Sequence, residues 1–308
     1  MEFGKVDPAE LGTINFTLPA DGQHTTSVLG HQTIGKADIV LGCAKWGTKE
    51  WLDYLYPAKT KEINFLNEYA KHFNAIELNA AYHQPPSIET VRKWKKKVAA
   101  TAAGRFFFCP KFPRIITHDL KLMGAENATD DFITAVAEFE ENLGACFLQL
   151  SDSFGPENFS ILHAYLHSLP VHLSVFVELR HYQWFADPVR RKEVLELLSS
   201  LKKGIVITDV SGRRDVLHME LTIPEVFIRF IGNGAKQKTL DYGRIDEWAI
   251  RLKKWQGNGL QKINFFVHQQ QERDTLRLAN YAIDVFNKEL GSQLSKIILQ
   301  PSLFGEDD

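Results

Sequence analysis

Eight short apolar runs, separated by segments with helical periodicity, constrain the fold of this chain most strongly. Each run is rich in β-branched and aromatic residues and is too short for a buried helix, so each predicts a strand. The runs span residues 37–45, 75–82, 105–112, 146–151, 174–180, 204–211, 225–232 and 262–269. Most of them are continuously apolar, which is typical of parallel strands that are covered on both faces.

The segments between the runs repeat apolar residues at spacings of three and four. In residues 59–73, for example, Ile63, Leu66, Ala70 and Phe73 form one apolar stripe. Eight alternations of strand and helix predict a parallel sheet that closes into a TIM-type (β/α)8 barrel. Only residues 212–224 separate the sixth and seventh runs, so we expect helix six to be short or missing.

An open, doubly wound sheet is the alternative fold. It is less favoured because the first turn after a strand, "GCAKWGTKEW", contains no G-x-G-x-x-G dinucleotide fingerprint. The sequence therefore offers no dinucleotide fingerprint, and the identity of any cofactor is unknown.

The chain divides into one barrel domain over residues 37–295, an N-terminal extension over 1–36 and a C-terminal tail over 296–308. The extension shows no sustained hydrophobic period, and we expect it to lie over the barrel. Its start has no signal-peptide pattern, and no run approaches the ~18 apolar residues of a membrane span. These features predict a soluble cytoplasmic protein that does not bind membranes.

Cysteine content and charge limit the partners. Cys43, Cys109 and Cys146 each lie within an apolar segment, which predicts buried, reduced thiols rather than a zinc site. The 308-residue chain has a formal net charge of −2 and a pI near 6.6, so it has no overall basic field for nucleic acid. The expected partner is a small molecule.

Polar residues collect near the carboxyl ends of the predicted strands, where barrel enzymes place their active sites. Alternation along the second strand puts Glu77 and Asn79 on one face, and alternation along the fifth does the same for Glu178 and Arg180. The last inward residues of the other strands are predicted to be Lys111, Gln149, Asp209, Arg229, Asn264 and His268. Three acids and three bases are therefore expected to converge at one end.

Further candidates lie just beyond the strand ends. Trp46, Tyr82 and Trp184 are expected near the mouth, where an aromatic ring can stack on a ligand. His118 and His181 are positioned to transfer protons, although a structural hydrogen bond is an equal alternative for each.

This charge pattern bears on which chemistries the site could support. Glu77, Glu178, Asp209 and His268 are suitable divalent metal ligands, but three cationic side chains at the same mouth oppose a metal ion, so a metal site is not favoured. A common barrel glycosidase needs acids at the ends of strands four and seven, where this chain has Gln149 and Arg229. Lys111 is either an anion-binding group or, as the less favoured alternative, a Schiff-base nucleophile.

The motifs also resemble a known family, the domain-of-unknown-function family 72, which is also called YecE-like. They are "GCAKWGTKEWLDYLYP", "AIELNAAYHQPP", "FFFCPKFPRIITH", "LGACFLQL", "VFVELRHYQWF" and "VFIRFIGN", in the family's order between about Ile39 and Ala282. The resemblance implies a TIM-type barrel of unassigned activity. The sequence departs from the family pattern at Ala80-Ala81, where a Ser/Thr-Phe pair is usual, and at His268, where an Asn-rich ending is typical.

The leading hypothesis is an enzyme that acts on a small polar, anionic metabolite. In this hypothesis Lys111, Arg180 and Arg229 hold the anion, Glu178 or Glu77 is the general acid or base, and Asp209 orients a partner. The substrate-binding set is expected to include Trp46, Asn79, Tyr82, Gln149, His181, Trp184 and His268. The alternatives are a noncatalytic metabolite-binding protein, a metal-dependent hydrolase or isomerase, and a nucleic-acid-processing barrel.

Overall fold

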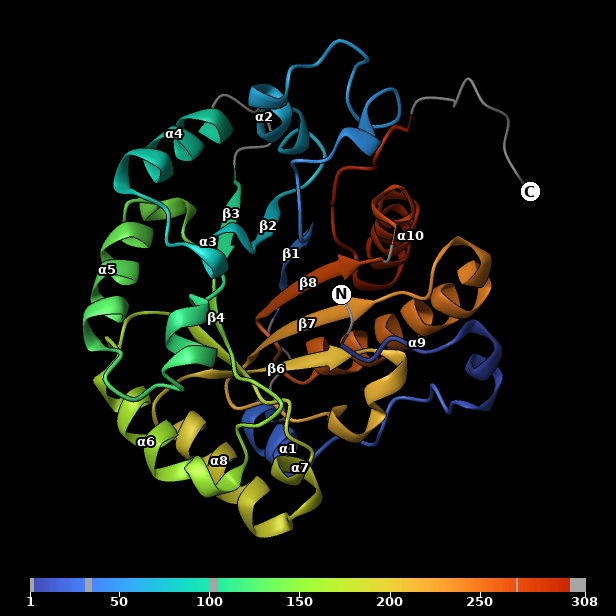
Figure 1. Ribbon diagram of the computed structural model, residues 1–308. Helices are drawn as coiled ribbons and strands as arrows, with labels where there is room; N and C mark the ends of the chain where they lie inside the picture. The colour runs from blue at the N-terminus through green and yellow to red at the C-terminus, as the bar shows by residue number, and fades with distance from the viewer. Residues whose placement is uncertain (1–2, 31–34, 100–104, 270, 300–308) are drawn as a thin grey trace.

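Eight parallel strands form the centre of the computed structural model, which describes residues 3–30, 35–99, 105–269 and 271–299 (Figure 1). The strands are β1 Asp38–Cys43, β2 Ala75–Leu78, β3 Phe107–Pro110, β4 Cys146–Gln149, β5 Val175–Glu178, β6 Gly204–Asp209, β7 Glu225–Ile231 and β8 Lys262–His268. Their order in the sheet is β3-β2-β1-β8-β7-β6-β5-β4, and every pairing is parallel. The predicted TIM-type barrel is confirmed.

The barrel closes between β3 and β4 through isolated contacts rather than a continuous ladder. Parallel bridges join Phe108 to Leu143 and Lys111 to Phe147. The backbone N–H of Phe112 also donates to the carbonyl oxygen of Phe147 at 3.0 Å. Lys111 therefore lies on the seam that completes the barrel.

Helices surround the sheet (Figure 1). The outer helices are α2 Phe65–Tyr69, α4 Ile88–Ala99, α5 Glu126–Ala137, α6 Phe159–Ser168, α8 Pro188–Ser200, α9 Lys238–Gly257 and α10 Glu272–Leu290. Two short helices, α3 Ala80–His83 and α7 Gln183–Ala186, lie in the segments that follow β2 and β5. β2 ends at Leu78 and β5 at Glu178, before the predicted ends at 82 and 180, because the chain leaves the sheet there to form the segments that contain α3 and α7.

The link between β6 and β7 contains a short 3₁₀ helix, Ser211–Val216, and no α-helix, as the sequence predicts for helix six. Helix α1, Gln23–Leu29, packs against this link. The Thr25 hydroxyl donates to the carbonyl oxygen of Met219 at 2.7 Å and accepts from the N–H of Leu221 at 2.7 Å. The N-terminal extension thus covers a side of the barrel that a sixth helix would otherwise protect, and its seven-residue helix is too short to show a period in the sequence.

The core has two layers because alternate strand residues face opposite ways. The outer layer lies between sheet and helices, whereas the inner layer fills the barrel. Aromatic rings dominate the inner layer: the Phe227 centroid lies 5.0 to 5.5 Å from the centroids of Phe147, Phe176 and Phe266. This apolar floor separates the amino end of the barrel from the polar residues at its carboxyl end.

The three cysteines are free and buried, as predicted. Of the predicted tail, residues 296–299 are described: Ile297 is buried, and its N–H donates to Asn280 Oδ1 at 3.0 Å. Residues 300–308 lie outside the described part of the chain. Across the described helices, none combines the length and apolar character that crossing a membrane requires.

Candidate functional site

Arg229, on β7, is the centre of a buried ionic network at the carboxyl end of the barrel. Its Nε and Nη2 donate to both oxygens of Glu77 on β2, each at 2.9 Å. Its Nη1 donates to Glu178 Oε2 on β5, also at 2.9 Å. One guanidinium group therefore joins two carboxylates from distant strands, and all three side chains are buried. The predicted convergence of these three residues is confirmed.

Further groups satisfy the remaining oxygens of the two glutamates. Asn79 Nδ2 donates to Glu77 Oε1 at 2.9 Å, and His268 Nε2 lies 2.9 Å from Glu77 Oε2. Gln149 Nε2 donates to Glu178 Oε2 at 2.9 Å, and Arg180 Nε donates to Glu178 Oε1 at 2.8 Å. Each carboxylate is thus hydrogen-bonded on both of its oxygens.

These contacts fix the ionisation of the network. Burial alone raises the pKa of a carboxyl group, but the positive charge of Arg229 and the contact with His268 outweigh it and hold the pKa of Glu77 well below its usual value. Burial opposes ionisation of Glu178 as well, yet Arg180 and Arg229 lower the pKa of Glu178 to about 2. Both glutamates are therefore charged at neutral pH.

Lys111 follows β3 and differs from these saturated residues. Its Nζ donates to Gln149 Oε1 at 2.6 Å and lies 3.9 Å from the ring centroid of Tyr82. No carboxylate within the described ranges forms an ion pair with it, although its side chain is only 7% exposed. Burial and the positive charge of Arg229 lower the pKa of Lys111 to about 7. A substantial fraction of this amine is consequently uncharged at neutral pH.

Arg180 also keeps bonding capacity. Its Nε is paired with Glu178, but in the described part of the chain its two Nη atoms have no hydrogen-bond acceptor. Its side chain is 12% exposed. The ring of Phe3 covers one face of the guanidinium, with 3.9 Å between the Cζ atom and the ring centroid. No pattern in the sequence predicts that Phe3, in the extension, reaches this site.

Tyr82 packs against Lys111, and His118 packs against Tyr82. Tyr82 belongs to α3, and its ring lies 5.5 Å from that of His118, edge to face. His118 lies in a single π-helical turn, Ile115–Asp119, a local irregularity that often occurs at functional sites. Burial, together with the positive charges of Lys111 and Arg180, lowers the pKa of His118, so this imidazole is neutral at neutral pH.

The placement of Asp209 inside the barrel was wrong. Pairing along β6 puts Thr208 opposite Arg229, whereas Asp209 faces the helices. There its carboxylate accepts from Trp248 Nε1 at 2.8 Å and pairs with Arg244 at 2.8 Å and with Arg214. Inward and outward residues alternate along β6, so Thr208, which was not among the predicted site residues, is the inward residue at this level.

Two predicted aromatic residues are also placed away from the network. Trp184 is completely buried, and its indole N–H donates to the carbonyl oxygen of Phe154 at 2.7 Å. Trp46 packs edge-on against Trp94 of α4, with 5.4 Å between ring centroids. The prediction that Trp184 lies at the mouth, where its ring could stack on a ligand, is therefore wrong. His181 is partly exposed beyond β5, where its Nδ1 accepts from the N–H of Gln183.

The geometry also bears on the alternative chemistries. Arg229 occupies the space between Glu77 and Glu178, where a shared metal ion would have to lie, and Asp209 is on the other side of the sheet. In many barrels the loop after strand seven binds phosphate through backbone N–H groups. Here the N–H groups of Asn233, Gly234 and Ala235 donate to side-chain oxygens of the protein itself.

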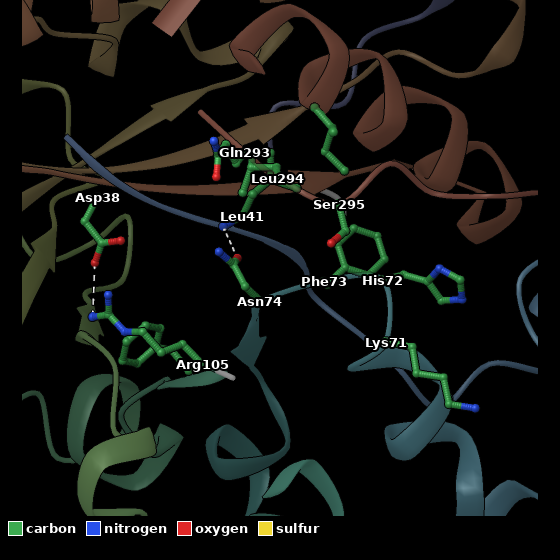
Figure 2. Close-up of a pocket in the computed structure, with 12 residues that line it drawn as sticks. Asp38, Leu41, Lys71, His72, Phe73, Asn74, Arg105, Gln293, Leu294 and Ser295 are labelled. Atoms are coloured by element: carbon green, nitrogen blue, oxygen red, sulfur yellow. Dashed lines mark hydrogen bonds and ion pairs between the residues drawn. The ribbon is translucent and has the colours of Figure 1, made fainter. Parts of the chain in front are cut away.

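A separate pocket of about 140 Å³ lies at the amino end of the barrel (Figure 2). Asn74 braces it by accepting from the N–H of Leu41 and donating to the carbonyl oxygen of Ile39, each at 2.8 Å. Arg105 and Asp38 form an ion pair at 3.2 Å on its wall. Barrel enzymes place their active sites at the opposite, carboxyl end, and these contacts hold the strand starts together.

Comparison with known proteins agrees with this fold. The model of a family described as "Protein of unknown function DUF72" matches residues 40–300. The UPF0759 protein YecE of Escherichia coli (strain K12) is 28% identical over 235 residues, which cover 70% of this chain and 82% of that protein.

Solved structures of two proteins of that family share the barrel. A DUF72 family protein of Enterococcus faecalis V583 superposes with a TM-score of 0.65 at 22% identity and covers 82% of this chain and 99% of its own. One from Thermotoga maritima MSB8 gives 0.59 at 23% identity, covering 83% and 100%. Since the family model matches most of the chain, the protein belongs to the DUF72 family.

Proposed function

We propose that this protein is an enzyme that acts on a small anionic metabolite at the carboxyl end of its barrel. The observation that carries the proposal is the unused bonding capacity of Lys111 and Arg180. The charges of Glu77 and Glu178 are already balanced by Arg229 and Arg180, so the protonated Lys111 adds one positive charge. A bound anion supplies the missing counter-charge and the missing hydrogen-bond acceptors.

The proposal assigns different roles to residues that the sequence grouped together. Arg180 and Lys111 bind the anion, whereas Arg229 is a positioning residue because both glutamates occupy its guanidinium group. Glu77 and Glu178 act as fixed counter-charges rather than as general acids or bases, since their pKa values are held low. Proton transfer is assigned to Lys111, whose pKa is lowered to about 7, and to His118, whose pKa is lowered below its usual value.

A noncatalytic metabolite-binding protein is the second candidate. The saturated glutamates favour it, because a network with no free carboxylate can simply hold Arg180 in place for a ligand. Turnover of a bound compound separates the two candidates, since only the enzyme converts it.

A thermal-shift screen with inorganic phosphate and a panel of anionic and neutral metabolites tests the proposal. An anion at about 100 times its Kd is expected to raise the melting temperature by roughly 4 °C. Arg180→Met and Lys111→Met should each lose this shift. Arg105→Met is the matched control, because this arginine lies at the opposite end of the barrel.

Equal shifts in all three variants, or shifts with neutral compounds alone, would contradict the proposal. Each measurement is repeated with EDTA. A shift that disappears with EDTA in the unmodified protein would replace anion binding by the metal-dependent alternative.

A further inference from the structure

The amine of Lys111, one of the two proposed anion-binding groups, has an environment that also suits a nucleophile. It lies at the end of a buried strand, against the face of Tyr82, and it makes one hydrogen bond, to the neutral side-chain oxygen of Gln149. An ammonium group has three N–H donors, and a buried one is normally paired with a carboxylate. The described residues give Lys111 no such partner, so its surroundings suit the uncharged amine.

Arg180 is a cationic group with free donors, and it joins the same network through Glu178 and Gln149. Gln149 accepts from Lys111 and donates to Glu178, and Glu178 accepts from Arg180. This chain of hydrogen bonds fixes the amine relative to the guanidinium group. The two Nη atoms of Arg180 have the planar geometry that binds a carboxylate or phosphate through two parallel bonds.

We infer that Lys111 forms an imine with the carbonyl carbon of a small compound whose acid group is bound by Arg180. The substrate class is therefore a carbonyl compound that carries an acid, either an oxo acid or a phosphorylated aldehyde. This inference rests on the proposed function and adds to it the identity of the nucleophile and of the reacting group.

The reaction needs no oxidant or reductant. The lone pair of Nζ forms a bond to the carbonyl carbon, the carbonyl π electrons move to oxygen, and a proton passes from nitrogen to that oxygen. The hydroxyl group of this carbinolamine then leaves as water with one further proton, and the C=N bond forms. His118, whose ring packs edge to face against the Tyr82 ring that Lys111 covers, is the group assigned to exchange these protons.

Trapping with sodium borohydride tests the inference, because hydride reduces an imine to a stable secondary amine. The intact protein is incubated with pyruvate, with glyceraldehyde 3-phosphate or with the neutral ketone acetone, then reduced, digested and mapped by mass spectrometry. An adduct is expected on Lys111 with one of the two anionic probes, at least tenfold above the adduct level on exposed lysines. The probe that reacts distinguishes the oxo acid from the phosphorylated aldehyde.

Variants separate the roles of the residues. Arg180→Met should reduce trapping by the anionic probe at least tenfold while leaving the low level obtained with acetone unchanged. Lys203→Met serves as the matched control, since Lys203 is also buried but lies at the other end of the barrel. Lys111→Met, checked for folding by circular dichroism, should show no adduct at this position and no compensating one elsewhere.

The outcomes also separate this inference from the proposed function. Anion-dependent thermal shifts without any adduct on Lys111 would overturn the imine and leave anion binding intact. Trapping by acetone as efficient as trapping by the anionic probes would overturn the role of Arg180. The absence of both shift and adduct would overturn the inference and the proposed function together.

Discussion

The two ends of the barrel each bury a lysine, and they treat it in opposite ways. Lys203, just before β6, donates to the carbonyl oxygens of Leu173 at 2.7 Å and Pro170 at 3.0 Å. Its Nζ also lies 3.5 Å from the carbonyl oxygen of Val171. Lys111, just after β3, has one amide oxygen and the face of an aromatic ring. The first amine is saturated by the backbone, whereas the second retains capacity for another molecule.

The same contrast extends to the surrounding residues. At the amino end, Asn74 and the Asp38–Arg105 pair tie strand starts together around the pocket in Figure 2. At the carboxyl end, Glu77, Glu178 and Arg229 are fully hydrogen-bonded to one another and to their neighbours, whereas Lys111 and Arg180 retain N–H donors without an acceptor among the residues that the structure describes. Polar groups that are fully used by the protein stabilise it, and polar groups with spare capacity indicate where a ligand binds.

The largest predicted effect is that of Arg229→Met. This change leaves Glu77 and Glu178 buried with much less opposing charge, which is expected to lower the free energy of unfolding by about 3–5 kcal/mol. Urea denaturation monitored by circular dichroism measures it. Arg105→Met, which breaks a surface pair at the other end, is the control and should cost less than about 1 kcal/mol. Similar losses in the two variants would show that the network does not depend on Arg229.

Lys203→Met should have the next largest effect. It leaves carbonyl oxygens of the loop before β5 without their donor, at a cost of about 1–3 kcal/mol. Lys111→Met should cost less than about 1 kcal/mol at pH 7, because this amine makes one hydrogen bond and its charged form is disfavoured by burial. If Lys111→Met proved the more destabilising variant in urea denaturation, the contrast between the two lysines would be reversed.

The pH dependence of stability sharpens the contrast. The unfolded chain keeps the proton of Lys111 up to a pKa of about 10.4, whereas in the folded protein the pKa is lowered to about 7. Between these values the unfolded state binds more protons, so the contribution of Lys111 to stability rises with pH. Relative to Lys111→Met, the unmodified protein should gain about 1 kcal/mol between pH 7 and pH 8.

Paired urea denaturations at the two pH values measure this gain. The variant is its own control, since every other titrating group is present in both proteins. Below about pH 6 the difference should level off, because Lys111 is then protonated in both states. A constant difference from pH 6 to pH 9 would mean that the pKa of Lys111 is not lowered.

The fold was predictable because strand and helix segments alternate along the sequence. The central network was predictable because successive residues of a strand point to opposite faces. Glu77, Glu178 and Arg229 each follow an inward apolar residue by two positions, so strand geometry alone directs them into the barrel. The same rule fails for Asp209, since one residue of error at a strand end reverses the face. Local periodicity predicts neither the burial of Trp184 nor contacts made over long separations, such as that between Phe3 and Arg180.

The smallest predicted effect concerns that contact. Phe3→Ala removes a ring that lies over the guanidinium of Arg180, and the stability cost should not exceed about 1 kcal/mol. Because one face of Arg180 is then open, borohydride trapping at Lys111 should become at least twofold faster. Phe16→Ala is the matched control, since Phe16 belongs to the same extension but covers Arg214 and Arg244 in the network around Asp209. Equal acceleration in both variants would attribute the effect to general loosening of the extension, and no acceleration in either would mean that Phe3 does not restrict access to the open end of the barrel.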